Sequence, residues 1–295
     1  MKLTVDPEKC TLCGACIPTC PTEMVRSKGE FIKIGRVACI ECGHCIAICP
    51  EGAIEDEEGG LTPQPLSIND CRSSGEGETA TAGGLKALIQ RRRTVRRYKA
   101  EPVAREVIEG LLDTARWAPT AANCQAQEYV VITDPAAKDR LRREIEAHYR
   151  GFAEALADKE MRSARLAALG LDGEFATHPH MLAAVPAFVK AVDAGRDRLF
   201  FEAPVVIVVH AAANEVMPEA ACAFATLALV LMAEAHGLGT CITGYASDAL
   251  RQRADIRGSL SLPETNQVHY VVALGWPAEE FPRVPTRRPA KVAWQ

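Results

Sequence analysis

The 295-residue chain has few aromatic side chains, little net charge and no apolar run that we expect to cross a membrane. Phe, Trp and Tyr make up 5% of it, and the formal net charge is −4. The most apolar stretch, residues 220–233, stops at Glu234 before reaching the roughly 20 residues that a spanning helix needs. We interpret it as a helix buried on all sides inside a protein. The first residues form no apolar signal region, so we expect a cytoplasmic protein with no membrane partner.

The first sixty residues are poor in the side chains that build a hydrophobic core. Phe31 is the single aromatic residue among them. Ten acidic residues against six basic ones give this segment the whole net charge of the chain, so the remainder is balanced. A segment of this size and composition buries too little apolar surface to fold alone. We therefore expect bound metal to hold it together.

Cysteine is abundant in the same segment. Eight of the twelve cysteines lie in two copies of one pattern, C-x2-C-x2-C-x3-C-P. The first copy is Cys10, Cys13, Cys16 and Cys20 before Pro21, and the second is Cys39, Cys42, Cys45 and Cys49 before Pro50. Thiolates at these intervals converge on one soft inorganic core. Paired zinc knuckles and a disulfide framework remain as alternatives, although zinc sites usually have a longer loop and disulfides need an oxidising compartment.

The spacing resembles that of bacterial ferredoxins with two 4Fe-4S clusters, over residues 1 to about 57. In that family the fourth cysteine of each run binds the other cluster. The resemblance implies that one cluster is bound by Cys10, Cys13, Cys16 and Cys49, and the other by Cys39, Cys42, Cys45 and Cys20. We therefore assign residues 1–58 to a two-cluster ferredoxin domain.

Residues 59–84 separate this domain from the rest of the chain. They are rich in Gly, Ser, Thr and Pro and have no repeating apolar period, which predicts a flexible linker. An ordered strap is the alternative, since Ile68 and Cys71 could anchor it. Residues 85–295 then form a second domain.

The second domain mixes helical and strand patterns. Apolar residues at helical spacing mark residues 107–115 and 141–152 as amphipathic helices. β-Branched runs at residues 129–133, 205–210 and 268–274 predict buried strands. The mixture, without strict β-α-β repeats, predicts an α+β fold.

Residues 91–98 of this domain, RRRTVRRY, carry a cluster of arginines. The simplest interpretation of such a run is a solvated basic face or a patch that binds nucleic acid. The domain is otherwise charge-balanced and lacks interleaved stacking aromatics, so we expect no nucleic-acid partner. Guanidinium groups also suit the bidentate binding of a phosphate monoester.

From about Leu85 onward the chain resembles the FMN-dependent nitroreductase family in four separated motifs. The first is the arginine segment, with Thr94 in place of the commoner serine. The second is WAPTAANCQ at residues 117–125, after which Ala126 and Gln127 replace the family's Pro-Trp. The third is GLGTCITG at residues 237–244, and the fourth is the basic turn around Arg287 and Arg288. Gly237 and Gly239 do not match a dinucleotide fingerprint, so we expect no Rossmann domain.

The resemblance implies a role for each matching residue. The FMN phosphate and ribityl chain would be held by Arg92, Thr94 and Arg288, with Arg93 or Arg287. Arg96 would lie at the pyrimidine edge of the flavin, and Asn123 would bond the isoalloxazine. Pro119 and Thr120 would shape the same wall, and Gln125 belongs to the same motif. A backbone N–H at Thr243 or Gly244 would meet flavin N5, so no catalytic side chain is implied. The family also implies an intertwined homodimer with FMN at the interface.

We therefore expect a fused electron-transfer enzyme with FMN and two 4Fe-4S clusters. Electrons from an external donor, a reduced ferredoxin or NAD(P)H, would pass through the clusters to FMN. The flavin would reduce a small organic acceptor, nitroaromatic or quinone-like, by hydride transfer from N5. Two alternatives stay open: an electron-transfer module docking on a larger redox complex, or a reductive dehalogenase or ene reductase of the same flavin family. Phe175, His178, His180 and Met181 are candidate pocket residues in a segment that we expect to be a loop.

Overall fold

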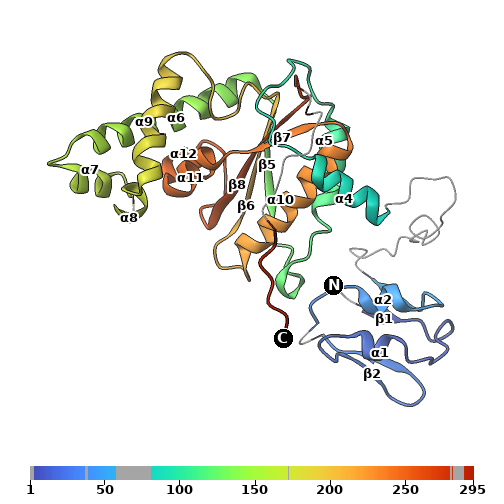
Figure 1. Cartoon of the computed structure of the whole chain (residues 1–295). Helices are drawn as coiled ribbons and strands as arrows, with labels where there is room; N and C mark the ends of the chain where they lie inside the picture. Colours follow the sequence, from blue (N-terminus) through green and yellow to red (C-terminus); the bar gives the residue numbers. More distant parts are fainter. Residues whose placement is uncertain (1–2, 37–38, 58–80, 172, 280, 282–288) are drawn as a thin grey trace. The chain divides into compact units, whose positions relative to one another are not determined.

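The computed structural model describes residues 3–36, 39–57, 81–171, 173–279, 281 and 289–295. Contacts divide the chain into two compact units. The smaller unit is residues 1–81 with 122–124, and the larger is residues 82–121 with 125–295 (Figure 1). The predicted linker, residues 59–84, lies outside the described residues up to position 80.

The smaller unit contains short strands and two short helices. The strands are β1 (Leu3–Val5), β2 (Val25–Ser27), β3 (Ile32–Ile34) and β4 (Ile54–Asp56), and the helices are α1 (Cys16–Thr19) and α2 (His44–Ile48). β1 pairs with β4 and β2 pairs with β3, both antiparallel. Its small core holds Val25, Ile32, Ile46 and Ile54 next to the cysteines at the start of each helix. Such a core agrees with the low apolar content of this segment.

The two cysteine runs have the same backbone geometry. Equivalent residues adopt the left-handed conformation in both copies: Leu12 and Glu41, Gly14 and Gly43, Glu23 and Gly52. The fourth cysteines also match, because the Met24 N–H donates to Cys20 Sγ at 3.2 Å and the Ala53 N–H to Cys49 Sγ at 3.2 Å. The repeat seen in the sequence is therefore a repeat in structure, and both halves can bind the same kind of group.

The larger unit is built on a four-stranded antiparallel sheet in the order β5-β6-β8-β7. The strands are β5 (Glu128–Ile132), β6 (Val205–Ala212), β7 (Gly239–Ile242) and β8 (Asn266–Gly275). Its longer helices are α4 (Ala82–Arg91), α5 (Arg105–Ala115), α6 (Pro135–Ala157), α9 (Pro179–Asp193), α10 (Pro218–Ala235) and α11 (Gly244–Gln252). Shorter ones are α7 (Arg162–Ala168), α8 (Gly173–Ala176) and α12 (Ala254–Gly258), while η1 (Ala121–Asn123) belongs mostly to the smaller unit.

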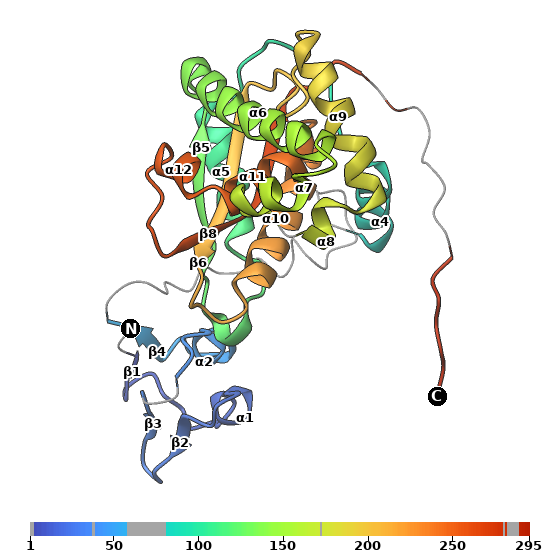
Figure 2. The ribbon, with the colours of Figure 1, turned by 90° about the vertical axis from the view of Figure 1, so that its left-hand side faces the viewer.

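Helices cover both faces of the sheet, as Figures 1 and 2 show. Val205, Ile207 and Val209 of β6 pack with residues of α5 and α10. Val206 and Val208 point the other way and pack with α6, α9 and α11. Because alternate side chains of a strand face opposite sides, β6 must be apolar along its whole length, as its sequence VVIVVHAA largely is. The predicted α+β class is confirmed, with the sheet between two helical layers.

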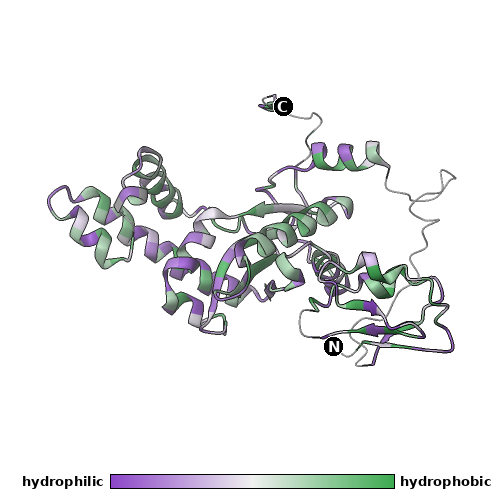
Figure 3. Cartoon of the chain, turned by 90° about the horizontal axis from the view of Figure 1, so that it is seen from below, coloured by the Kyte–Doolittle hydropathy of each residue, from purple (hydrophilic) through white to green (hydrophobic). Residues whose placement is uncertain are grey.

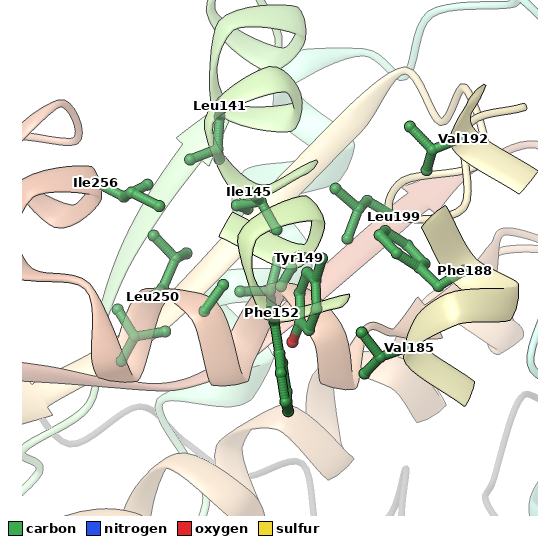
Figure 4. Packing of buried hydrophobic residues seen from close by; sticks show 14 of the residues in the cluster. Leu141, Ile145, Tyr149, Phe152, Val185, Phe188, Val192, Leu199, Leu250 and Ile256 are labelled. Carbon is green, nitrogen blue, oxygen red and sulfur yellow. The ribbon is translucent and has the colours of Figure 1, made fainter. Parts of the chain in front are cut away.

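The core on the α6 side is aromatic at its centre. Tyr149 and Phe152 of α6 face Phe188 of α9, and Figure 4 shows these rings among Ile145, Leu199 and Leu250. The Tyr149 and Phe188 ring centroids are 5.2 Å apart in an edge-to-face arrangement. In Figure 3 hydrophilic and hydrophobic residues alternate along the surface helices, as amphipathic packing on the sheet requires.

The helix predicted at residues 107–115 and the strands predicted at 129–133, 205–210 and 268–274 are present with ends shifted by one or two residues, and the helix predicted at 141–152 lies inside the longer α6. Two of the expected segments differ from the structure, and one strand was not expected. Helix α4 begins at Ala82, inside the predicted linker, and the segment around His178 that we expected to be a loop belongs largely to α8 and α9. The short strand β7 within the GLGTCITG motif was not predicted.

Helix α10 is not buried on all sides, contrary to the sequence expectation. Its inner face packs on the sheet and α5, but Phe224 is 48% and Leu227 53% exposed within this single chain. By length and composition alone α10 could cross a membrane, although 39% of that stretch is buried inside the protein. A helix of this composition is also typical of a protein core. One chain therefore leaves an apolar face of α10 uncovered.

Candidate functional site

The cysteines of the smaller unit surround two cavities. Cys10, Cys13, Cys16 and Cys49 line the first, and Cys20, Cys39, Cys42 and Cys45 line the second. These are the two sets that the ferredoxin resemblance implied, with the fourth cysteine of each run exchanged. The assignment of ligands remains a prediction, and the geometry brings the required thiols together.

The thiols suit a multi-iron cluster better than a single ion. Among the described residues, no three His, Cys, Asp or Glu side chains lie close enough together to bind one metal ion. Ligands of a zinc ion would converge on one point, whereas ligands of a 4Fe-4S cluster bind separate iron atoms around a larger core. Burial raises the pKa of Cys45 to about 11, so bound metal would be needed to hold this thiol deprotonated at neutral pH.

The arginine segment of the larger unit runs beside β7. Thr94 forms a parallel bridge with Thr240, and the Val95 N–H donates to the Thr240 carbonyl at 2.9 Å. The far end is held by hydrogen bonds from the Lys99 N–H to the Trp276 carbonyl and from the Ala278 N–H to the Arg97 carbonyl. The backbone of Arg96 is thus fixed between two anchors, while its side chain is exposed.

Arg96 lines a cavity of about 730 Å³ in the larger unit. Strand β7 supplies Cys241 and Ile242, Thr243 follows it, and α11 supplies Gly244, Tyr245 and Asp248. Helix α9 supplies a wall that includes Met181 and Phe188, and the segment before β6 supplies Arg196, Arg198 and Phe201. The volume lies within the usual range for cofactor and small-molecule pockets, about 300 to 1,000 Å³.

The two predicted N–H donors of this cavity are not equivalent. The Thr243 N–H donates to the Val271 carbonyl at 2.8 Å, so it is already used within the protein. Gly244 is the first residue of α11, where the N–H groups have no carbonyl partner in the helix. Ser247 supports this corner by donating from Oγ to the Thr243 carbonyl at 2.9 Å and accepting from the Val271 N–H at 2.9 Å. Gly244 is therefore the better candidate donor to a flavin N5.

The cavity is rich in positive charge. Its described lining contains three arginines, Arg96, Arg196 and Arg198, and one carboxylate, Asp248. Asp248 pairs with Arg251 at 3.3 Å, and burial raises the pKa of the Asp248 carboxyl. Burial also raises the pKa of the Cys241 thiol, with nearby Arg96 lowering it in part. The net field of these groups attracts anions.

The second family motif is not part of this cavity in the described chain. Pro119 is exposed and Thr120 half-buried, and Thr120 Oγ1 accepts from the Gln125 N–H at 3.0 Å. Ala122, Asn123 and Gln125 all have positive φ, which marks a strained turn. Residues 122–124 group with the smaller unit, where Asn123 Nδ2 donates to the carbonyls of Ile40 and Glu41.

The remaining predicted residues have varied surroundings. Arg92 is half-buried at the end of α4, and its N–H donates to the Leu88 carbonyl at 3.0 Å. The Arg93 guanidinium turns back to the carbonyls of Gln90 and Arg92. Arg287 and Arg288 lie outside the described residues, as do the side chains of Phe175 and His180. His178 is exposed and lies outside the cavity lining, whereas Met181 is part of it.

Sequence reasoning missed Arg196, Arg198, Phe201 and Asp248. The charged triplet at residues 196–198 lies in the segment before the strand predicted at residues 205–210, and this position alone is a weak signal. Connecting segments on a rigid scaffold often carry binding residues, so such a segment is a reasonable place to look for them.

Two family models match the chain. The model described as the nitroreductase family matches residues 89–276, and the model described as a 4Fe-4S dicluster domain matches residues 2–50. These findings confirm the fusion predicted from the sequence, with FMN-bound proteins in one family and a two-cluster domain in the other.

Curated relatives are similar to the larger unit. A protein named NADH dehydrogenase from Thermus thermophilus is 29% identical over 69% of this chain and 93% of the relative. A chloronitrobenzene nitroreductase from Comamonas testosteroni is 27% identical over 66% of this chain and 88% of the relative.

Solved structures share the fold of the larger unit. One is an oxidized iodotyrosine deiodinase bound to FMN and 3-iodo-L-tyrosine, with 21% identity and a TM-score of 0.50 over 72% of this chain and 98% of that one. Another is an FMN- and NADPH-dependent nitroreductase from Sphigopyxis sp. strain HMH, with 22% identity and a TM-score of 0.51 over the same shares. At these identities the likeness shows the fold alone.

Proposed function

Because the chain belongs to the nitroreductase family, we propose that it is an FMN- and iron-sulfur-dependent oxidoreductase whose clusters pass electrons to the flavin. The observation that carries the proposal is the cavity where Arg96 and the start of α11 meet, in a chain that also holds two four-thiol sites. Bound FMN would supply hydride transfer from N5 to a small organic acceptor such as a nitroaromatic or a quinone, and the clusters would supply single electrons.

The residues of the larger unit have distinct tasks in this proposal. Arg92, Thr94 and, beyond the described residues, Arg288 would bind the FMN phosphate through charge-assisted hydrogen bonds. Arg96 would stabilise negative charge at the pyrimidine edge, and the Gly244 N–H would donate to N5. Phe188 and the apolar part of the α9 wall would exclude water from the reacting edge.

A homodimer would complete the site. Phe224 and Leu227 expose the outer face of α10, and the motif at Pro119–Gln125 lies outside the cavity lining of the described single chain. A second copy that covers α10 could bring its own motif to the cavity, because a twofold interface presents each patch to its equivalent. We place the protein in the cytoplasm, where reduced thiols are available for cluster assembly.

Cofactor analysis tests the proposal directly. Protein purified without oxygen should contain about eight iron atoms with matching sulfide, as two 4Fe-4S clusters require, and one FMN per chain. It should also reduce a nitroaromatic or quinone with a chemical reductant. Zinc in place of iron and sulfide, or a protein that binds no flavin, would refute the proposal. Turnover of haloaromatics or activated alkenes in place of nitro compounds would favour a dehalogenase or ene reductase of the same family.

A further inference from the structure

We propose that Arg196 and Arg198 form an anion-binding subsite that selects acceptors carrying a carboxylate. The inference rests on the proposed function and names the substrate class of the same cavity. Both arginines line the cavity together with Phe201, and neither belongs to a motif that sequence analysis singled out for FMN.

The first observation is the lack of a carboxylate partner for these guanidinium groups. Elsewhere in the larger unit arginines pair with acids, as Arg150 does with Asp193 and Arg253 with Asp255. Among the described residues neither Arg196 nor Arg198 has a carboxylate within ion-pair distance. Asp248, the one carboxylate of the described lining, is paired with Arg251. Two cations left without counter-charges in a concave site suit an anionic ligand.

The second observation is that the backbone carrying these arginines is fixed. The Gly195 N–H donates to the Val192 carbonyl at 2.8 Å, and the Arg196 N–H donates to the Ala191 carbonyl at 3.1 Å. With Gly195 at φ 77°, this is a Schellman motif that closes α9. The chain therefore leaves the helix in one direction, with Arg196 at a set position.

Asp197 fixes the next turn in place of pairing with its neighbours. Its Oδ1 accepts the N–H groups of Leu199 and Phe200 at 2.9 Å each, and its Oδ2 accepts the Glu202 N–H at 2.9 Å. The carboxylate is thus engaged with backbone, and the arginines on either side remain available. A subsite held in place before the ligand arrives loses less entropy on binding.

The third observation places Arg198 near the proposed reacting edge. The guanidinium carbons of Arg198 and Arg96 each lie 5.9 Å from the centroid of the Phe201 ring. Burial raises the pKa of Tyr245, and the nearby Arg198 lowers it in part. Tyr245 directly follows Gly244, the candidate N5 donor. An acceptor whose reducible group lies over N5 could therefore reach Arg198 with a carboxylate on the far side of its ring.

The FMN phosphate is a less suitable occupant of this subsite. The parallel bridge between Thr94 and Thr240 places Arg92 toward the Leu238 end of β7 and Arg96 toward the Ile242 end. Arg92, proposed for the phosphate, therefore lies at one end of the segment, and Arg96, which shares the cavity with Arg196 and Arg198, lies at the other.

The test uses the full chain loaded with FMN and a chemical reductant as donor. Acceptors are 4-nitrobenzoate and its neutral methyl ester, compared in the wild type, in R196Q/R198Q and in R140Q. Arg140 is exposed on α6 outside the cavity lining, so R140Q removes a positive charge without touching the subsite. Equilibrium dialysis of benzoate and benzamide measures binding apart from turnover.

The ratio of kcat/KM for the acid to that for the ester should fall about tenfold or more in R196Q/R198Q, since each lost contact is charge-assisted. Benzoate binding should weaken by a similar factor, while ester turnover, benzamide binding and the R140Q ratio change less than about twofold. R196K/R198K should keep part of the preference, because it keeps the charge.

Three results would overturn the inference: an unchanged acid-to-ester ratio in R196Q/R198Q, loss of FMN from that variant, or, when NAD(P)H replaces the chemical reductant as donor, a rise in KM confined to NAD(P)H. The second would assign the arginines to the cofactor and the third to a nicotinamide donor. A wild type that reduces neither acceptor, yet binds benzoate through these arginines, would count against the proposed function and leave the anion subsite standing.

Discussion

Arg92 and Arg96 lie on one extended segment with different surroundings. Arg92 is half-buried where α4 ends, and Arg96 projects into the cavity beside Cys241 and Ile242. The same chemical group can therefore bind a phosphate at one position and tune a flavin ring at the other.

Alanine at these two positions should separate the roles. R92A should lose FMN on dialysis, because it removes a charge-assisted contact worth roughly 1.5–3 kcal/mol. R96A should keep most of its FMN but show a lower flavin midpoint potential, since the positive charge stabilises the reduced ring. Flavin content and spectroelectrochemical titration check both, with R140A as the control. Full flavin affinity and an unchanged potential in both variants would place the flavin elsewhere.

Buried histidines make stability depend on pH. His148 is 2% exposed, and burial, together with the Arg253 guanidinium, lowers its pKa from 6.5 to about 4, while Asp255 opposes the shift. The unfolded chain therefore binds a proton between pH 6.5 and 4 that the folded chain does not. The contribution of neutral His148 to the free energy of unfolding is therefore complete above pH 6.5, and it is lost as the pH falls toward 4.

The free energy of unfolding should fall between pH 7 and pH 5, by about 1–2 kcal/mol for His148. Burial lowers the pKa of His210 and His269 as well, so they add to the same trend. Urea titrations of wild type and H148Q measure it, with H236Q at an exposed position as the control. A pH slope as steep in H148Q as in the wild type would contradict this assignment.

At the scale of elements, the close contact between the arginine segment and β7 positions the site. A Cβ built on Gly239 would lie 2.7 to 2.9 Å from three side-chain atoms of Val95. Val95 is 3% exposed and its backbone is bonded to Thr240, so it cannot move aside easily. Glycine at 239 is therefore required for the segment that carries Arg96 to lie against the sheet.

The variant G239A should lower the free energy of unfolding by about 1–3 kcal/mol through overpacking. It should also weaken FMN retention by displacing the arginine segment. Gly110 in α5 is the matched control, because a Cβ added there would have nothing within 4 Å and alanine favours a helix. We expect G110A to be neutral or stabilising in chemical denaturation. Equal stability of the two variants would show that the contact is not tight in solution.

The uncovered face of α10 leads to a prediction about assembly. L227E should shift the protein from dimer to monomer in analytical ultracentrifugation, because it buries a charge in an apolar contact. The control variant is M161E. Met161 lies just before α7 and is 53% exposed, so this variant should leave the dimer intact. A monomeric wild type, or a dimeric L227E variant with unchanged affinity, would exclude α10 from the interface.

Elements with a simple repeating pattern could be predicted from the sequence. Elements that depend on contacts with residues far away in the sequence could not. The strand β6 and the helices α5 and α6 follow from apolar periodicity, and the cysteine runs follow from their spacing. Strand β7 was not predicted because it is short and begins with glycine, a poor strand former. Gly239 is needed there for the close contact with Val95, which is far away in the sequence. Arg196 and Arg198 were missed because only the fold brings them to the cavity of Arg96.

At the scale of the whole molecule, two cofactor domains share one chain. The smaller unit brings eight cysteines into two four-thiol sets, and the larger unit forms a cavity suited to a flavin. Covalent linkage gives the clusters an effective concentration at the flavin that is set by the length and stiffness of the linker. Electron transfer from cluster to flavin is the reason we propose for the fusion.

The most direct test of this electron transfer from the clusters to the flavin compares the full chain with a variant that starts at Ala82, where the larger unit begins. Both are loaded with FMN and assayed without oxygen, using a reduced low-potential ferredoxin or NAD(P)H as donor and a nitroaromatic as acceptor. The full chain should turn over much faster with ferredoxin than with NAD(P)H, its cluster absorbance should change during turnover, and the shortened chain should lose the ferredoxin-driven rate. Equal NAD(P)H-driven rates in the two proteins, with clusters that stay oxidised throughout turnover, would contradict the proposal.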